Sequence, residues 1–257
     1  PALVWVETPS NPLLRITDIR HVAQAAHAAG ALRVVDNTFL SPALQQPLAL
    51  GADVVVHSTT KYINGHSDVV GGAVVAREAG VAEQLKAWAN CLGLTGAPFD
   101  SYLTLRGLRT LGPRLRAHCD NAARIAQLLD AHPAVSRVYL PGLDAHPGHA
   151  LAARQQHGFG AMLSFELAGG VDAIAAFVEG VEFCLAAESL GGVESLIAHP
   201  ATMTHASMAA EARRNAGISD DLLRVSVGIE EGDDLCRDLE AALQRALAAG
   251  KRKQVCA

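Results

Sequence analysis

A lysine beside three hydroxyl side chains is the first feature of this sequence that could carry chemistry. Ser58, Thr59, Thr60 and Lys61 follow an apolar run at 53–57. Hydroxyl groups at a strand end can donate hydrogen bonds to a phosphate, and a lysine is either a cation or, once desolvated, a nucleophilic amine. Taken alone, these four residues are typical of an ordinary loop with a solvated lysine.

An acid at the end of the preceding apolar run adds a second chemical group. Asp36 closes the run at 32–36. Ligands of open α/β sheets bind at the carboxyl ends of strands, although a lone aspartate there more often caps a helix or joins a salt bridge. Together with Lys61 and its hydroxyl neighbours, Asp36 fits pyridoxal phosphate (PLP). This cofactor needs a Schiff-base lysine, an acid for its ring nitrogen and donors for its phosphate.

The first half of the chain alternates strand-like and helical segments. A helical pattern at 18–29 has Thr17 in the N-cap position and ends at Gly30. The strand-like runs lie at 3–6, 32–36, 53–57 and 71–76. This alternation predicts an α/β fold with a mostly parallel sheet covered by helices on both faces.

The predicted helices and strands of the second half follow a different order. A long helix is expected over 99–129, which Gly112 and Pro113 could interrupt. Further strands are expected at 135–139, 162–167, 181–185 and 223–227, and helices at 171–179 and 233–248. We therefore expect two units: a large domain over 1–119 and a smaller C-terminal α+β domain over 120–257.

Composition excludes several classes of protein. Half of the 257 residues are apolar, which provides a core, and the net charge of -5 disfavours nucleic acid as a partner. The single basic block, 251–253, is typical of a solvated end. The cysteines occur singly, at Cys91, Cys119, Cys184, Cys236 and Cys256, as in a reducing cytoplasm. No apolar run is long enough for a bilayer span, so we expect a cytoplasmic protein without membrane contact.

The segment 53–67 resembles the signature of a known enzyme family. Its pattern is Asp53-Val54-x-x-x-Ser58-Thr59-Thr60-Lys61-Tyr62-Ile63-x-Gly65-His66-Ser67, as in the Cys/Met-metabolism PLP-dependent (trans-sulfuration) enzymes, the cystathionine γ-synthase group. The resemblance continues through 7–12, 35–39, 102–111, 188–196 and 222–230, and so covers essentially the whole chain. Segments 90–100 and 201–206 are most similar to the bacterial synthases of this family.

The resemblance implies a role for each matching residue around the cofactor. Lys61 would form the Schiff base and later act as a general acid and base. Asp36 would pair with the ring nitrogen, and Ser58 and Thr60 would bind the phosphate. Asn11 would lie near the ring oxygen or the substrate carboxylate.

Three further residues would serve the substrate. Arg224 would bind the α-carboxylate, since a guanidinium fork suits a carboxylate, and Ser189 would position Lys61 or the substrate. Glu188 would select the substrate amine, or is a simple surface acid. Without the surrounding motifs, Arg224 and Ser189 would be read as a surface ion pair and a helix cap. His146 and His149 lie in a Pro-Gly turn without ligand spacing, and we expect no metal.

The family also implies a fold, an activity and an assembly. These are PLP fold type I, a homotetramer built as a dimer of dimers, and small amino-acid substrates. The implied reaction joins O-succinyl- or O-acetylhomoserine to cysteine and gives cystathionine. Cystathionine γ-lyase or a related lyase or sulfhydrylase is the alternative within the family, and a non-catalytic truncated PLP-fold protein is the alternative outside it.

The chain begins directly in a strand-like run at 1–6. We expect the true start to lie upstream, and the chain to lack the N-terminal part of the family. In the family, that part carries a tyrosine that stacks on the ring, backbone amides that bind the phosphate and a Tyr-x-Arg element of a neighbouring subunit. A form without them is expected to bind PLP weakly and turn over slowly.

Overall fold

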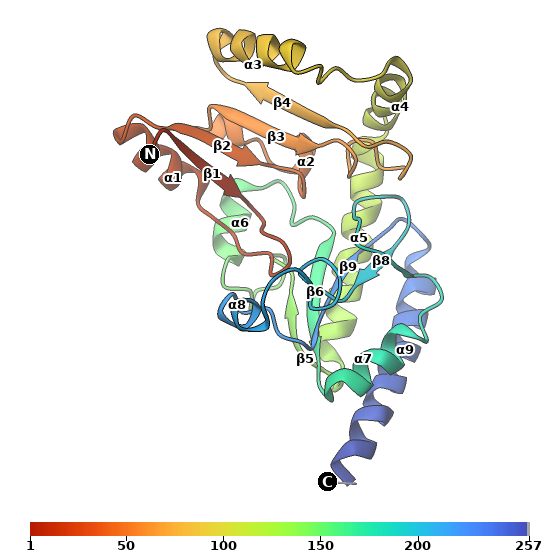
Figure 1. Cartoon of the computed structure of the whole chain (residues 1–257). Coiled ribbons are helices and arrows are strands. Elements are labelled where there is room, and N and C mark those ends of the chain that lie inside the picture. The colour runs from red at the N-terminus through yellow and green to blue at the C-terminus, as the bar shows by residue number, and fades with distance from the viewer. Residues whose placement is uncertain (256–257) are drawn as a thin grey trace.

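The computed structural model describes the backbone of residues 1–255 and the side chains of residues 1–250. The basic block at 251–253 and Cys256 lie outside the residues whose side chains are described. Two sheets lie one above the other in Figure 1, with the N-terminal sheet at the top and the C-terminal sheet below it. Within the described residues, no helix is both long and apolar enough to cross a membrane.

The N-terminal sheet has the strand order β1-β2-β3-β4. Its strands are β1 (Leu3–Glu7), β2 (Leu32–Asp36), β3 (Val54–Ser58) and β4 (Gly72–Ala76). The first three strands run parallel, and β4 is antiparallel to β3. All four strands were predicted from their apolar runs, and the mostly parallel α/β sheet is confirmed.

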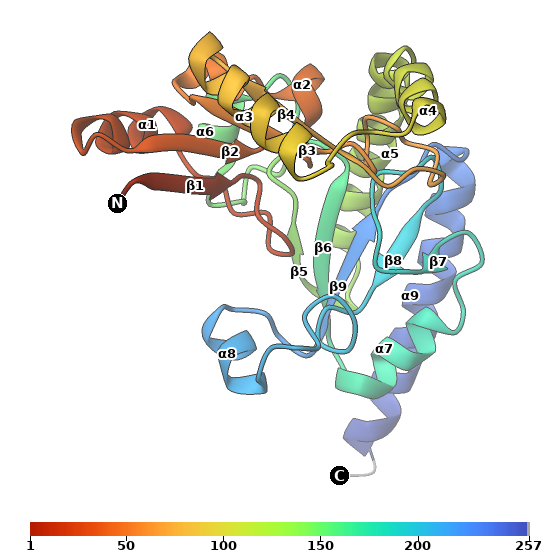
Figure 2. The same ribbon diagram turned by 45° about the horizontal axis from the view of Figure 1, so that its top comes forward.

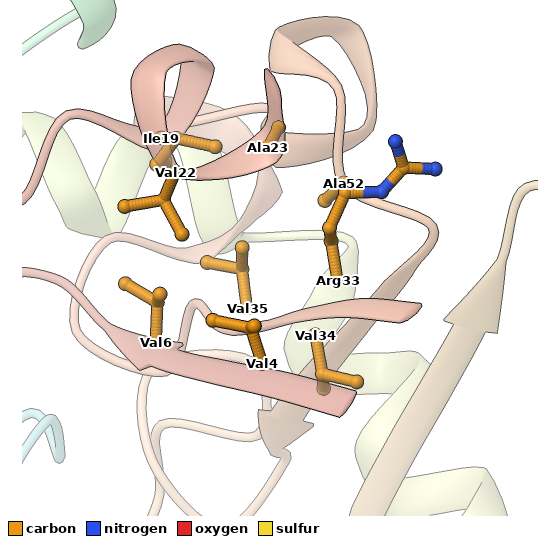
Figure 3. Close-up of a pocket in the computed structure, with 9 residues that line it drawn as sticks. All are labelled: Val4, Val6, Ile19, Val22, Ala23, Arg33, Val34, Val35 and Ala52. Carbon is orange, nitrogen blue, oxygen red and sulfur yellow. The ribbon is translucent and has the colours of Figure 1, made fainter. Parts of the chain in front are cut away.

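Helix α1 (Ile19–Ala28) crosses from β1 to β2 and covers one face of the sheet. Figure 3 shows Ile19 and Val22 of α1 above Val6 and Val35 of the two strands. The space between them measures about 10 Å³, roughly the volume of one water probe. It is therefore a packing gap and not a ligand site. On the opposite face, Trp5 is exposed.

The N-cap of α1 differs from the prediction. The Asp18 side chain, and not that of Thr17, accepts the hydrogen bond from the His21 amide, at 3.0 Å. The amide of Thr17 instead donates to Thr8 Oγ1 at 3.0 Å. Both residue types are good N-caps, so spacing alone did not separate these neighbours. Gly30 follows the helix with a φ of 67°, as its predicted role at the helix end requires.

The C-terminal sheet has the strand order β5-β6-β9-β8-β7. Its strands are β5 (Val135–Tyr139), β6 (Met162–Leu167), β9 (Leu222–Ser226), β8 (Leu196–Ala198) and β7 (Leu185–Ala186). Neighbours are antiparallel except β7 and β8, which are parallel.

Three helices pack on this sheet and form the main core with it (Figure 2). They are α5 (Leu111–Ala131), α7 (Gly170–Val178) and α9 (Gly232–Val255). Large side chains of this core are fully buried: Ile125, Leu129, Phe165, Phe177, Leu223 and Leu239. The remaining helices are α2 (Ser41–Leu44), η1 (Pro47–Leu50), α3 (Ala79–Cys91), α4 (Pro98–Leu108), α6 (His149–Gln155) and α8 (Ala210–Asn215).

Two predicted elements are wrong in their bounds. The strand expected at 181–185 is confined to β7, which is two residues long. The helix expected over 99–129 is divided into α4 and α5, and the break lies at residues 109–110 rather than at Gly112 and Pro113. Pro113 lies in the first turn of α5, where a helix has no use for the missing amide hydrogen.

The domain division expected between residues 119 and 120 falls inside α5. A cut at that point would divide a continuous helix. The division of the chain into two domains stays a prediction.

The ion pair between Arg33 and Asp53 ties β2 to the start of β3. The Arg33 hydrogen bond holds the pKa of buried Asp53 below its ordinary value. A depressed carboxyl pKa contributes stability above the unfolded pKa, and this stability is lost as the pH falls through the folded pKa. Asp53→Asn is therefore expected to lower the free energy of unfolding at pH 7 by about 2 kcal/mol.

Urea denaturation at several pH values measures this effect. The difference between the wild type and Asp53→Asn should shrink as the pH falls below about 4. Asp130→Asn, an exposed change on α5, should stay within about 0.5 kcal/mol of the wild type. A difference for Asp53→Asn that does not vary with pH would mean that the ionised Asp53 carboxylate does not stabilise the fold through Arg33.

Candidate active site

The predicted acid and lysine lie at the same edge of the N-terminal sheet. Asp36 is the last residue of β2, and Lys61 follows the last residue of β3, Ser58. The two strands are parallel neighbours, with Asp36 opposite Val56. Carboxyl ends of parallel strands meet at one edge, where ligands of open α/β sheets bind.

Lys61 reaches from this edge to the C-terminal half of the chain. Its Nζ donates to Ser189 Oγ at 3.0 Å. Burial of the half-buried side chain lowers the pKa of Lys61, and the nearby charge of Arg224 lowers it further. Both effects favour the neutral amine, which is the form that acts as a nucleophile or a base.

Arg224 of β9 is the buried cation of the site, with 2% of its surface exposed. Its Nη1 donates to Asn11 Oδ1 at 3.2 Å, and its Nη2 donates to the carbonyl oxygens of Glu188 at 2.6 Å and Ser189 at 3.0 Å. Its Nε is buried without a partner. Burial lowers the pKa of Arg224 to about 10, so the guanidinium is still charged near neutral pH.

The charges around Lys61 and Arg224 fit an anionic ligand. Among the described residues, neither side chain forms a salt bridge with a carboxylate. A guanidinium that is almost fully buried, with a second basic side chain nearby, is costly without a counter-charge. A ligand with a phosphate and a carboxylate would supply it. The donor set therefore fits PLP together with an amino acid.

The other predicted cofactor residues lie at the strand ends, and no hydrogen bond in the described part of the chain joins them to Lys61 Nζ. Asp36 Oδ1 accepts from the Thr38 amide at 2.9 Å. The hydroxyl of Thr60 accepts from the Gly71 amide at 2.9 Å and donates to the Gly71 carbonyl at 3.3 Å. That hydroxyl would have to turn its hydrogen from Gly71 to a phosphate.

Sequence reasoning missed three residues that hold the site together. Glu7 Oε1 accepts from the Asn11 amide at 2.9 Å, and burial raises the pKa of Glu7. Thr38 Oγ1 accepts from the amide of Ser58 at 2.9 Å. Glu7 and Thr38 lie in segments that resemble the family, so these segments were the available signal. Arg114, the third, donates to the carbonyl oxygens of the two residues after Lys61. It lies outside the segments that resemble the family.

Glu188 takes a smaller part than one of its expected roles required. Its carbonyl oxygen binds Arg224, whereas the residue itself is exposed. Its selection of a substrate amine is a prediction that no contact in this structure tests.

The histidine turn at 146–149 has partners of its own. His146 Nδ1 accepts from the Gly148 amide at 3.0 Å, and His149 Nδ1 lies 2.9 Å from the Pro141 carbonyl oxygen. Across the described residues, no group of three His, Cys, Asp or Glu side chains is arranged to hold a metal ion.

A lysine at the strand ends of an α/β sheet, linked through one serine to a buried arginine, is typical of a PLP-dependent enzyme. The model of the Cys/Met metabolism PLP-dependent enzyme family matches residues 1–244, and the chain belongs to this family.

Individual relatives agree with this assignment. The cystathionine γ-synthase of Escherichia coli is 58% identical over 246 residues, which are 96% of this chain and 64% of that protein. The cystathionine γ-lyase of Dictyostelium discoideum is 51% identical over 95% of this chain and 63% of its own length. The crystal structure of cystathionine γ-synthase from Xanthomonas oryzae pv. oryzae in complex with cystathionine is 70% identical, with a TM-score of 0.95 over 97% of this chain and 64% of that one. The chain thus spans somewhat less than two thirds of these relatives.

Proposed function

We propose that the protein is a cystathionine γ-synthase, which replaces the γ-substituent of O-succinyl- or O-acetylhomoserine with cysteine. The observation that carries the proposal is that Ser189 links Lys61 to Arg224: its hydroxyl accepts from Lys61 Nζ, and its carbonyl oxygen accepts from Arg224 Nη2. The 70% identity to the Xanthomonas synthase that was solved with cystathionine supports this activity.

PLP, when bound, supplies an electrophilic carbon and a ring that withdraws electrons. Lys61 would hold it, and its Nζ would then take the proton from the α carbon of the substrate. Ser189 Oγ, 3.0 Å from Nζ, orients that amine. Asp36 would keep the ring nitrogen protonated, while Ser58 and Thr60 would bind the phosphate.

Arg224 and Asn11 would orient the substrate. The guanidinium would hold the α-carboxylate, and the amide of Asn11, already bound to Arg224 at 3.2 Å, would fix its direction. A substrate held in this way would present its α carbon to Lys61. The acyl group would leave from the γ carbon as a carboxylate, with the electrons of the broken C–O bond. The cysteine thiol would lose its proton and form the new C–S bond at that carbon.

A γ-lyase is the second candidate, since a relative of that name is 51% identical. The two activities are separated by assaying the protein at its native length with O-succinylhomoserine plus cysteine, and in parallel with cystathionine alone. Formation of cystathionine in the first assay, faster than its breakdown in the second, is expected. Faster breakdown would favour the lyase.

A non-catalytic protein of the same fold is the third candidate. It would show neither reaction, even when saturated with PLP. The presence of Lys61, Asp36 and Arg224 together argues against loss of the site. We further propose a cytoplasmic homotetramer, built as a dimer of dimers, from the family resemblance; light scattering of the purified protein tests the assembly.

A further inference from the structure

Arg114 is a buried cation outside the set of side chains that meet the ligand. It lies in the first turn of α5 and is 5% exposed. In the described residues it forms no salt bridge, and burial lowers its pKa. The N-terminus of a helix also disfavours a positive charge. A cation at this position therefore needs compensating contacts.

Those contacts are with the backbone of the turn that carries Lys61. Nη1 donates to the carbonyl oxygen of Tyr62 at 2.9 Å, and Nη2 donates to that of Ile63 at 3.3 Å. Nη2 also donates to the carbonyl of Gly107 at 2.9 Å, and Nε donates to Thr110 Oγ1 at 3.2 Å. One planar guanidinium thus links the residues after Lys61 to the junction of α4 and α5.

Glycines leave room for this arrangement. A Cβ on Gly65 would lie 2.0 Å from Arg114 Nη1, and a Cβ on Gly107 would lie 2.2 Å from the Asn64 carbonyl oxygen. On another side of the turn, a Cβ on Gly191 would lie 2.8 Å from the Tyr62 amide nitrogen. The turn is therefore held between α5 and the loop that also carries Ser189.

We propose that Arg114 is a positioning residue that fixes the backbone after Lys61, so that Lys61 Nζ meets Ser189 and the cofactor. This inference rests on the proposed function, because it concerns the attachment of PLP to Lys61. Lysine cannot replace the arginine, since an ammonium group lacks the planar fork that spans several carbonyls.

The test compares Arg114→Lys with Arg116→Lys, an exposed change on the same helix. Each protein, at its native length, is mixed with PLP and quenched with borohydride at intervals. Peptide mass spectrometry then gives the fraction of Lys61 modified. We expect Arg114→Lys to slow attachment at least tenfold, with near-UV circular dichroism unchanged, and Arg116→Lys to match the wild type.

The pH profile of attachment separates positioning from a purely structural role. A misplaced Lys61 would lose the burial and the nearby Arg224 charge that lower the pKa of its amine. The pH at which attachment is half-maximal should therefore rise in Arg114→Lys. Thr110→Val removes the partner of Nε and the hydrogen bond from the Thr110 hydroxyl to the Gly107 carbonyl oxygen, but leaves the donors to Tyr62 and Ile63 in place. It should give a smaller change in the same direction, which keeps the test valid if Arg114→Lys does not fold. Native attachment rates and pH profiles in both variants, whatever their melting temperatures, would overturn the proposal. Absence of PLP on Lys61 in the wild type would instead overturn the proposed function.

Discussion

Replacement of Lys61 by alanine is expected to abolish the visible absorbance of lysine-bound PLP and to lower kcat by at least about 10³-fold, because a positioned acid-base group contributes on this scale. The Lys61 amine donates to Ser189 Oγ, and burial together with the charge of Arg224 lowers its pKa toward the neutral form. Absorbance spectra with added PLP and steady-state turnover measure the two effects.

The matched control is Lys86→Ala, since Lys86 is exposed on α3. It should keep the absorbance and the kcat of the wild type. If the colour of lysine-bound PLP survives in Lys61→Ala, another lysine holds the cofactor and the site described above is wrong.

Arg224→Lys is expected to raise KM for the amino-acid substrate by about 10- to 100-fold. The change preserves a positive charge but removes the fork, and hydrogen bonds between charged groups are worth about 1.5–3 kcal/mol. The smaller head would also leave the carbonyls of Glu188 and Ser189, or Asn11 Oδ1, without a donor. Initial rates over a range of substrate concentrations measure KM and kcat separately.

Arg214→Lys, at an exposed position on α8, is the control and should leave KM unchanged. A substrate analogue without the α-carboxylate provides a second comparison. Arg224→Lys should affect the reaction of the analogue much less than that of the substrate. An equal loss for both would mean that Arg224 supports the fold rather than the carboxylate.

Apolar patterning was sufficient for much of the fold. The strands β2 and β3 were predicted to within one residue of their bounds, because each is strongly apolar. The start of α9 was predicted to within one residue, but the helix extends to Val255 rather than ending at residue 248. Apolar patterning failed for an element whose formation depends on tertiary contacts. β7 is two residues long and is paired only with β8, and nothing in a run of two residues signals a strand.

The site was predictable in part for a similar reason. Lys61 and Asp36 are visible in the sequence because their chemical types follow apolar strands. Arg224 and Asn11 have no such local signal, and only the resemblance to the family indicated them. Arg114 acts on backbone carbonyls, which every sequence contains, so its role could emerge only from the three-dimensional arrangement.

The hydrogen bonds that join Lys61 to Ser189 and Arg224 to Asn11 span 128 and 213 residues of chain. Contacts of such separation form late in folding, because the chain must lose the entropy of closing a long loop before they contribute stabilising energy. During synthesis, these two hydrogen bonds cannot form until Ser189 and Arg224, respectively, have left the ribosome. The proposed site is therefore completed only near the end of translation, and a chain that stopped before residue 224 would lack the donor to Asn11 Oδ1.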